Sequence, residues 1–364
     1  MSGWQLGMVV ATACSGMVRA NEADLPTAVL RAAPEVRFPG VELEGWDHPV
    51  IDCNSPAHWD RGTFYLFNSA GHPSRTFGPD VLHLCPSERV TIDNEVNGGR
   101  WIEATHREPD GTLYAWYHNE PADVAPPNRE GRPLTAPRIG AMVSEDNGAT
   151  WHDLGLVLEA PPNTMREGSA NHYFAGGNGD FSVILDRDHE WFYFLISTYG
   201  DFAEQGVAIA RMRYEDRDEP VGKVLKWHDG KWDEPGIGGH LTPIFPAKVD
   251  WHNENADAFW GPSIHYNTYL RRYVMLLNRS KDYLWSQEGV YVSFCRDLSD
   301  PESWAEPQKI LNEGGWYPQV IGTNTPRRET DKLASRIARF FMFGVSNHEI
   351  VFLRPDERHS NGTR

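Results

Sequence analysis

Residues 179–198 read GDFSVILDRDHEWFYFLIST, and this stretch decides the fold. It contains a strand pattern, a short charged turn and a second, aromatic-rich strand pattern, with Asp180 where the first strand begins. A single β-hairpin cannot bury its apolar face, so a chain with several copies is expected to stack them around a shared axis. The stretch therefore predicts a repeat protein built from antiparallel hairpins.

The same pattern recurs in four other segments, each ending in an aromatic and apolar run typical of a strand: residues 51–70, 101–120, 260–279 and 316–346. A charged insert, TNTPRRETDKLAS, interrupts the last of them. Such units predict an all-β protein, a five-bladed β-propeller of four-stranded antiparallel blades, in which only short sheet edges remain open. The inner strands of this fold begin around a central funnel.

The predicted propeller covers residues 46–356 as a single catalytic domain. Residues 21–45 are a polar extension, expected either to wrap the outside or to close the ring by pairing with the last blade, and residues 357–364 are expected to be a disordered tail. Residues 1–20 have a short apolar stretch and a small-residue cleavage site but lack a positively charged start. We expect a signal peptide and a secreted or periplasmic protein, with a frayed extension as the alternative.

Composition excludes some classes of partner. Aromatic residues make up 12% of the chain, and together with 33 glycines and 26 prolines this is typical of a turn-rich β protein. A formal net charge of −17 repels a phosphate backbone, so no nucleic acid is expected. After the N-terminus, no segment is apolar for long enough to span a bilayer, so no membrane insertion is expected. The oligomeric state is left open.

Cysteines are few. Cys53, Cys85 and Cys295 remain after the predicted signal peptide. Cys53 and Cys85 both fall in the first blade and are near enough in sequence to form a pair there. So small a number nevertheless favours buried free thiols.

Residues 144–151, SEDNGATW, match the Asp box S-x-D-x-G-x-T-W of sialidases and other propellers. The roles expected of this motif are structural: Ser144 and Asp146 bond turn amides, Gly148 supplies a positive φ, and Trp151 packs under the hairpin. The motif therefore predicts the outer turn of the second blade and carries no catalysis.

Three acids fall at related positions of the repeats. A shift of 128 residues aligns the aromatic strands of the first and third units and places Asp52 on Asp180. Aligned on the second unit, Glu103 lies one pleat along the same strand face. Carboxylates crowded at the axis shift one another's pKa, so that one is ionised while another holds a proton, as glycoside hydrolysis requires. The alternative is that Asp52 and Asp180 only cap the starts of strands.

Two of these acids lie in recognisable surroundings. Asp52 precedes the strand GTFYL, and Asp180 precedes DRD at residues 186–188. In these features the sequence resembles the five-bladed propeller glycosidases of the arabinanase and xylosidase type, glycoside hydrolase family 43 and its relatives. Their fourth blade carries Glu-Gly-Pro with Glu as the general acid, whereas this chain has Trp260 in WGP.

The resemblance implies an inverting glycosidase that acts on a polysaccharide or oligosaccharide, with arabinose- or xylose-containing substrates expected first. It implies that Asp52 is the general base that activates water and that Asp180 orients the acid and tunes its pKa. The acid itself is missing, and its replacement is expected among other residues. The candidates are Glu103 first, then Asp257 or Glu254, and then a loop histidine such as His172.

The side chains expected to bind substrate around the funnel are Trp101, Trp260, Trp316, His172 and Asp257. For each of the three tryptophans, packing between blades is the alternative role. Three histidines near the funnel could hold an ion or a water at the axis: His106, His118 and His265. No spacing matches a zinc site, so no cofactor is required, and only a structural calcium or sodium ion is allowed for.

Other function classes remain open. A sialidase-like exo-glycosidase needs an arginine cluster for the substrate carboxylate. A polysaccharide lyase needs a Tyr or His to abstract the proton beside a uronate. A carbohydrate-binding propeller without catalysis needs neither, and the tryptophan at the family's acid position makes it a realistic alternative to the hydrolase. The residues on the funnel floor discriminate among these classes.

Overall fold

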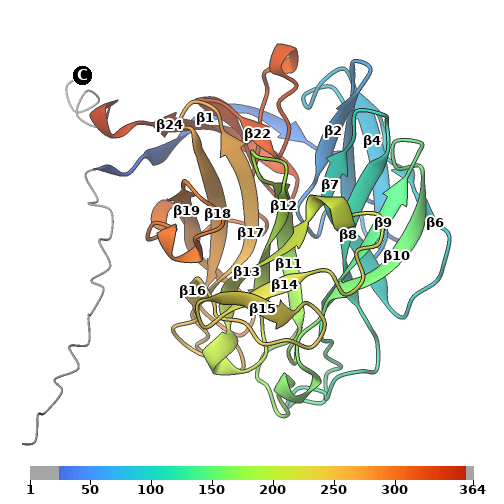
Figure 1. The fold of residues 1–364 in the computed structure, drawn as a ribbon, viewed down its shortest axis with the longest axis vertical. Helices are drawn as coiled ribbons and strands as arrows, with labels where there is room; N and C mark the ends of the chain where they lie inside the picture. The colour runs from blue at the N-terminus through green and yellow to red at the C-terminus, as the bar shows by residue number, and fades with distance from the viewer. Residues whose placement is uncertain (1–23, 358–364) are drawn as a thin grey trace, which may run out of the picture.

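Five sheets form the blades of a β-propeller in the computed structural model, which describes residues 24–357 (Figure 1). The all-β, five-bladed prediction is confirmed. The predicted signal peptide and most of the predicted tail lie outside the described residues. Among the described residues, no helix has the length and apolar character needed to cross a membrane.

The first two blades run outward from the axis in chain order. Blade one contains β2 (Ala57–Asp60), β3 (Thr63–Ser69), β4 (Pro73–Gly78) and β5 (Glu88–Arg89). Blade two contains β7 (Gly99–Arg107), β8 (Leu113–Glu120), β9 (Arg138–Ser144) and β10 (Thr150–Leu158), and β6 (Thr91–Ile92) adds to its outer edge in parallel.

The third and fourth blades follow the same plan. Blade three contains β11 (Asn178–Leu185), β12 (Trp191–Thr198), β13 (Gly206–Arg213), β14 (Leu225–His228) and β15 (Lys231–Pro235), and β16 (Phe245–Pro246) also pairs with β13. Blade four contains β17 (Ala258–Asn267), β18 (Arg272–Ser280), β19 (Gln287–Cys295) and β20 (Gln308–Asn312).

The last blade combines both ends of the chain. It contains β21 (Gln319–Ile321), β23 (Ile337–Met342), β24 (Val345–Leu353) and, as its outer strand, β1 (Thr27–Arg37). β1 pairs antiparallel with β24, and the two lie side by side in Figure 1. Of the two roles predicted for the N-terminal extension, ring closure is the one found. The charged insert forms β22 (Leu333–Ala334), which pairs in parallel with β17.

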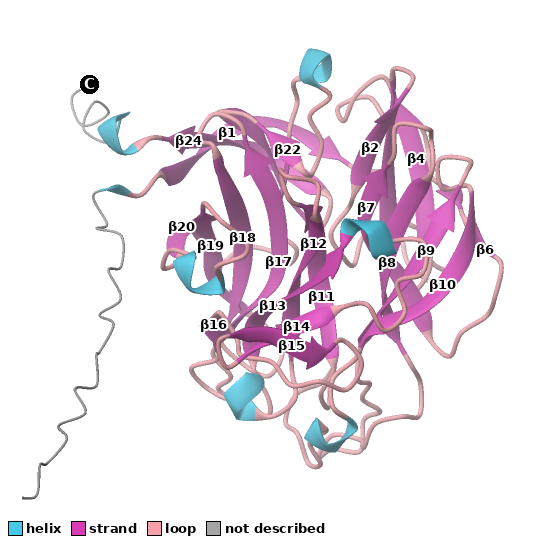
Figure 2. Cartoon of the chain, viewed as in Figure 1, coloured by secondary structure: helices cyan, strands magenta, loops and turns pink. Residues whose placement is uncertain are grey.

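Helical structure in the described residues consists of single 3₁₀ turns in the connections (Figure 2): η2 (Pro162–Thr164), η3 (Phe202–Glu204), η4 (Tyr214–Asp216), η5 (Pro301–Ser303), η6 (Thr325–Arg327) and η7 (Pro355–Glu357). The helices therefore contribute little to the core.

The aromatic strands pack between blades. Each neighbouring pair of blades shares one cluster of buried side chains. Between the second and third blades, for example, the rings of Trp116 and Phe192 are 4.8 Å apart. Burial of such large rings, together with the aliphatic side chains of the same clusters, stabilises the contact between blades. The aromatic residues that identified the repeats in the sequence therefore also hold neighbouring blades together.

The Asp-box segment forms the turn between β9 and β10. Ser144 Oγ accepts hydrogen bonds from the amides of Asp146 and Gly148, at 3.2 and 2.9 Å. Gly148 has a φ of 79°. The Trp151 indole donates to the Gly148 carbonyl at 3.0 Å and packs edge-on against Phe67 of the first blade. The motif thus stabilises a turn and links two blades.

The described cysteines are free thiols. Cys53 and Cys295 are buried, as expected for unpaired residues in a β core, whereas Cys85 is exposed. Cys85 follows β4 on the outer part of the first blade, far from the inner position of Cys53, and this separates the two residues that the sequence allowed to pair.

Candidate active site

Asp52 and Asp180 both lie where the chain enters an inner strand, but their backbones differ. Asp52 precedes β2 by a few residues, and its amide donates to the Ser69 carbonyl at 2.8 Å, which extends the pairing with β3. Asp180 is the extra residue of a bulge in β11, between the paired residues Gly179 and Phe181, and has a φ of 40°. A bulge of this kind re-aims a side chain, and a non-glycine residue with positive φ is kept only where its surroundings hold it.

Two tyrosines hold the carboxylate of Asp180. The Tyr199 hydroxyl donates to Oδ2 of Asp180. The Tyr317 hydroxyl lies 3.4 Å from Oδ1 of Asp180 and 3.5 Å from Oδ1 of Asp52, and so it bridges the two aspartates. Both contacts of Tyr317 are at the long end of the hydrogen-bond range. The first and third blades therefore present their acids to one phenol from the fifth blade.

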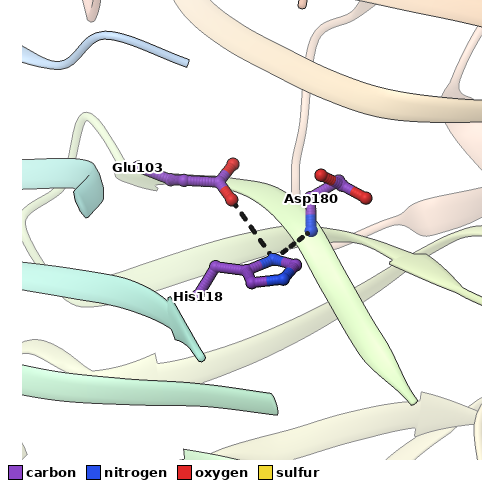
Figure 3. A group of neighbouring side chains, drawn as sticks. All are labelled: Glu103, His118 and Asp180. Carbon is purple, nitrogen blue, oxygen red and sulfur yellow. Dashed lines mark hydrogen bonds and ion pairs between the residues drawn. The ribbon is translucent and has the colours of Figure 1, made fainter. Parts of the chain in front are cut away.

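Glu103, His118 and Asp180 form the second part of the site (Figure 3). Nδ1 of His118 accepts a hydrogen bond from the Asp180 amide at 3.0 Å and lies 3.4 Å from Oε1 of Glu103. Oε2 of Glu103 accepts from the Phe181 amide at 3.0 Å. Nε2 of His118 lies 3.1 Å from Oε1 of Glu120. A chain of contacts thus runs from Glu103 through the imidazole to Glu120.

The protons of the imidazole follow from these contacts. In the neutral ring, Nδ1 accepts from an amide and carries no proton, so the proton is on Nε2. Burial lowers the pKa of His118, but the hydrogen bonds to Glu103 and Glu120 outweigh burial and raise it well above its usual value. In the charged ring Nδ1 also carries a proton, which Glu103 can accept but which leaves the Asp180 amide without its acceptor, so the contact with that amide belongs to the neutral ring. In either state Nε2 donates to Glu120.

The carboxyl groups of the site have raised pKa values. Burial, and then the negative charges of Glu120 and Asp180, raise the pKa of Asp52 from 3.8 to about 7. Burial and the charge of Glu103 likewise raise the pKa of Asp180 to about 7, although the charge of His118 opposes this. Burial also raises the pKa of Glu103. The group therefore retains protons near neutral pH, and these protons are shared among interacting sites.

The four acidic residues of the site, Asp52, Glu103, Glu120 and Asp180, differ in their exposure to solvent. Glu103 and Asp180 are 1% and 3% exposed. Asp52 is partly exposed, and the Glu120 side chain is 31% exposed. A ligand that enters from solvent therefore meets Asp52 and Glu120, whereas Glu103 and Asp180 lie beneath them.

Aromatic side chains surround the acids. Trp101 is 9% exposed and packs edge-on against His118, with ring centres 5.5 Å apart. Trp316 is partly exposed and packs against Tyr173 from the loop that follows η2. Trp260 has no exposed surface, because it lies between the rings of Trp285, Trp316 and Tyr317. A sugar would therefore meet Trp316 rather than Trp260.

The remaining predicted site residues are engaged elsewhere. Asp257 forms a two-pronged ion pair with Arg279, with both distances 2.7 Å. His172 faces Glu130 at 3.4 Å, and Glu254 pairs with Arg129 at 2.6 Å. None of these contacts joins the carboxylate group, so the structure does not bring these candidates to it.

The predicted histidines separate in the same way. His118 lies in the carboxylate group, whereas His106 pairs with Glu108 at 3.2 Å near the other end of β7. His265 is buried against Phe352 in the space between the fourth and fifth blades. Of the three, only His118 is placed to act at the funnel.

Glu103, His118 and Asp180 have ligand atoms within 4.8 Å of one another, a spacing that could hold a metal ion. Several of these atoms already accept hydrogen bonds from the protein. Nδ1 of His118 accepts from the Asp180 amide, one oxygen of Glu103 accepts from the Phe181 amide, and one oxygen of Asp180 accepts from the Tyr199 hydroxyl. Calcium takes six to eight oxygen ligands, so this donor set does not fit it.

A cavity of about 380 Å³ lies at the opposite ends of the inner strands. It is lined by residues that end β7 and β11 and by the charged insert, among them Arg107, Arg187 and Lys332. Its lining reaches Val183 on β11 and Thr105 on β7, three and two residues along those strands from Asp180 and Glu103, but neither acid lines it. The cavity is therefore separate from the carboxylate group.

Sequence reasoning missed Glu120, Tyr199 and Tyr317 as members of the site. Glu120 ends the strand that follows β7 and pairs with Gly99 at the start of β7. The end of the second strand of a hairpin always returns to the start of the first, so this position was open to inference. No comparable signal marked the two tyrosines, because they come from a strand end and from a turn.

Comparisons with known proteins concern the fold. No family model matches the sequence, and no curated protein sequence matches it. The native arabinanase of Bacillus subtilis is 13% identical, with a TM-score of 0.45 over 85% of this chain and 96% of that one. An exo-β-1,3-galactanase from Phanerochaete chrysosporium is 12% identical, with a TM-score of 0.49 over 88% of this chain and 64% of that one.

An exo-1,5-α-L-arabinanase from a bovine ruminal metagenomic library is 13% identical, with a TM-score of 0.49 over 83% of this chain and 94% of that one. The likeness to each of these structures extends over most of this chain. Identities this low transfer neither an activity nor a catalytic residue from those proteins to this one.

Proposed function

We propose that this protein is a glycoside hydrolase that cleaves a polysaccharide or oligosaccharide at the funnel formed by the starts of the inner strands. The observation that carries the proposal is the pairing of Asp52, a partly exposed residue, with Asp180 through the Tyr317 hydroxyl at 3.5 and 3.4 Å, and the pKa of Asp52 is raised to about 7. Such a group can deliver or take a proton near neutral pH, as cleavage of a glycosidic bond requires.

Asp180 and Glu103 support this chemistry from below. Both are buried and held by hydrogen bonds, Asp180 by Tyr199 and Glu103 by the Phe181 amide. Their charges act on the exposed acids at short range in a poorly hydrated environment, where electrostatic interactions are strong. We assign them to orienting and tuning the groups that touch the substrate.

Trp101 and Trp316 are the aromatic side chains placed to contact a sugar ring. Both retain some exposed surface next to the acids. Stacking on an indole face would hold a ring against Asp52 through apolar contact, without requiring a charge on the substrate. The substrate class proposed is therefore a neutral glycan, and arabinans, xylans and galactans are the first to test.

Hydrolysis of this panel, and of nitrophenyl glycosides, tests the proposal directly. We expect reducing sugar to be released from at least one substrate by the wild-type protein and about 10²–10⁴-fold more slowly by Asp52→Asn. Binding of a glycan without any turnover would instead indicate a carbohydrate-binding propeller. The motif resemblance supports inversion at the anomeric carbon, which the anomer first formed would report by NMR.

A sialidase-like site is less well supported. Recognition of a sialic acid carboxylate calls for arginine side chains in the site. Within residues 24–357, no arginine forms an ion pair with Asp52, Glu103, Asp180 or Glu120. Turnover of a sialoside by the wild-type protein would contradict the proposed substrate class.

A further inference from the structure

We propose that Glu120 is the second catalytic carboxylate: Asp52 donates a proton to the leaving oxygen, and Glu120 activates the attacking water. This inference rests on the proposed hydrolase function and names the carboxylate that completes the catalytic pair, since the fourth blade supplies no acid. It also reverses the role of base that the motif resemblance implies for Asp52.

The residue at the family's acid position cannot take part in proton transfer. Trp260 has no ionisable group, and its ring is enclosed by Trp285, Trp316 and Tyr317. A second carboxylate must therefore come from another element. Glu103 is the nearest alternative, but it is 1% exposed, and both of its oxygens face protein groups, the Phe181 amide and the His118 ring.

Glu120 satisfies the requirement of access. Its side chain is 31% exposed, and its backbone pairs with Gly99 at the start of β7, on the side of the propeller from which Asp52 and Asp180 also emerge. Its charge acts on both aspartates, since it contributes to the raised pKa of each. Among the acids of this group, Asp52 and Glu120 are the two that a substrate can touch.

The contact with His118 fixes the role of Glu120. Nε2 carries a proton in both states of the ring and donates it to Oε1 of Glu120 at 3.1 Å. A carboxyl oxygen that accepts this hydrogen bond is held in one orientation, which suits a base. Asp52, in contrast, faces the phenol of Tyr317 and neighbouring negative charges that favour its protonated form, which suits an acid.

His118 is a positioning residue in this scheme. Asp180 holds the ring through its amide at 3.0 Å, and Glu103 faces the same ring nitrogen at 3.4 Å. The ring in turn holds Glu120. The buried acids thus act on the base through the imidazole, without touching the substrate.

The proposed step balances as a single displacement. The oxygen of a water molecule forms a bond to the anomeric carbon while Glu120 takes a proton from that water. The bond between the anomeric carbon and the glycosidic oxygen breaks, its electron pair remains on that oxygen, and the proton of Asp52 adds to it. The products are a hemiacetal and an alcohol, and one proton then returns from Glu120 to Asp52 through solvent.

Leaving-group dependence separates the two roles. We would measure the wild type, Asp52→Asn and Glu120→Gln on the polysaccharide that the panel identifies and on the corresponding dinitrophenyl glycoside. Dinitrophenolate leaves without a proton, so Asp52→Asn should lose about 10²–10⁴-fold on the polysaccharide and far less on the aryl glycoside. Glu120→Gln should lose a similar factor on both, because both need an activated water.

Azide provides a second readout. In Glu120→Ala, a small anion can enter the space of the carboxylate and attack without a base, so added azide should restore turnover and yield a glycosyl azide. Glu145→Gln is the matched control, since Glu145 is exposed on the Asp-box turn of the same blade. It should keep wild-type rates on both substrates. Glu120→Asp, which keeps the charge but shortens the reach, replaces Glu120→Gln if the latter fails to fold, and should lose about 10²-fold or more on both.

The outcomes are distinct. A wild-type protein that turns over nothing would overturn the hydrolase function itself. An active wild type with unaffected Glu120 variants would overturn only the role of Glu120. Loss in Glu120→Gln on the polysaccharide alone, with the aryl glycoside spared, would make Glu120 the proton donor and overturn the assignment of roles.

Discussion

The amide of Asp180 donates a hydrogen bond of 3.0 Å to Nδ1 of His118, across the boundary between the third and second blades. The amide is free for this contact because Asp180 is the extra residue of a bulge and does not use its amide in the β11–β12 ladder. A backbone irregularity in one blade thus sets the orientation of an imidazole in the next. The same imidazole reaches Glu120 at the edge of the funnel.

His118→Ala should reduce both stability and activity. The substitution leaves the Asp180 amide and an oxygen of Glu103 buried without this partner, at a cost of about 1–3 kcal/mol in the free energy of unfolding. It also releases Glu120, so kcat should fall while KM changes little. His118→Asn, whose amide can present an acceptor to Asp180, should recover part of the stability. Urea unfolding and steady-state kinetics of both variants check this, and an unchanged kcat in a folded His118→Ala would contradict it.

The pKa of Asp52 should fall in Glu120→Gln. The charge of Glu120 is the second cause, after burial, of the raised pKa of about 7. Removing that charge removes a repulsion against ionised Asp52, so its titration should move toward lower pH. Carbon-13 NMR of labelled aspartate carboxyl groups measures this without any need for activity. Glu145→Gln serves as control, and an unmoved Asp52 titration in Glu120→Gln would place the two groups too far apart to act together.

Asp180 should contribute stability that is lost as pH rises from about 4 to about 7. The pKa of Asp180 is about 7 in the folded protein, against an ordinary value of 3.8. Between these values the folded protein binds more protons than the unfolded chain, so raising the pH favours unfolding. Asp180→Asn removes this contribution, so between pH 4 and 7 the free energy of unfolding should change with pH in a more positive sense than in the wild type, even if the variant is less stable overall. Urea unfolding across this range tests the sign, with Asp188→Asn on an exposed turn as the matched control. An equal slope in wild type and Asp180→Asn would count against the raised pKa.

Trp260→Glu should not create an active acid. The new carboxyl group would enter a space enclosed by Trp285, Trp316 and Tyr317, where an unpaired charge is strongly disfavoured. Loss of the buried indole adds the cost of a large-to-small change, about 3–5 kcal/mol. We expect a marked fall in the unfolding midpoint and no gain in hydrolysis. A stable and more active variant would show that the fourth blade can still supply the acid.

The sequence predicted the fold because one physical requirement recurs along it. Each blade must bury an aromatic strand against its neighbour, so residues such as Phe64 and Phe192 return at equivalent places. The same repeat register predicted the common position of Asp52 and Asp180, and the structure joins them through Tyr317. The regular spacing of the repeats was thus enough to predict that Asp52 and Asp180 lie at equivalent places near the starts of inner strands.

The rest of the site depends on contacts that the repeat does not encode. Glu120 is on a second strand, and Tyr317 comes from a turn with a φ of 55° before β21. The bulge at Asp180 that frees its amide leaves no mark in a hydrophobic pattern. Trp260 looked available for a sugar because it lies near the start of β17, but rings from two other segments, Trp285 and the consecutive Trp316 and Tyr317, cover it completely.

The pairing of β1 with β24 closes the ring of blades through residues from opposite ends of the chain. Arg31 and Glu349, for example, are in contact although they are 318 positions apart. During synthesis the first strand leaves the ribosome long before its partner exists. Contacts of such large sequence separation slow folding, because the loop between them must be ordered first. The fifth blade, which is entered through the segment that carries Tyr317, is therefore completed only after almost the whole chain has been made, so a prematurely terminated chain would lack the closed funnel.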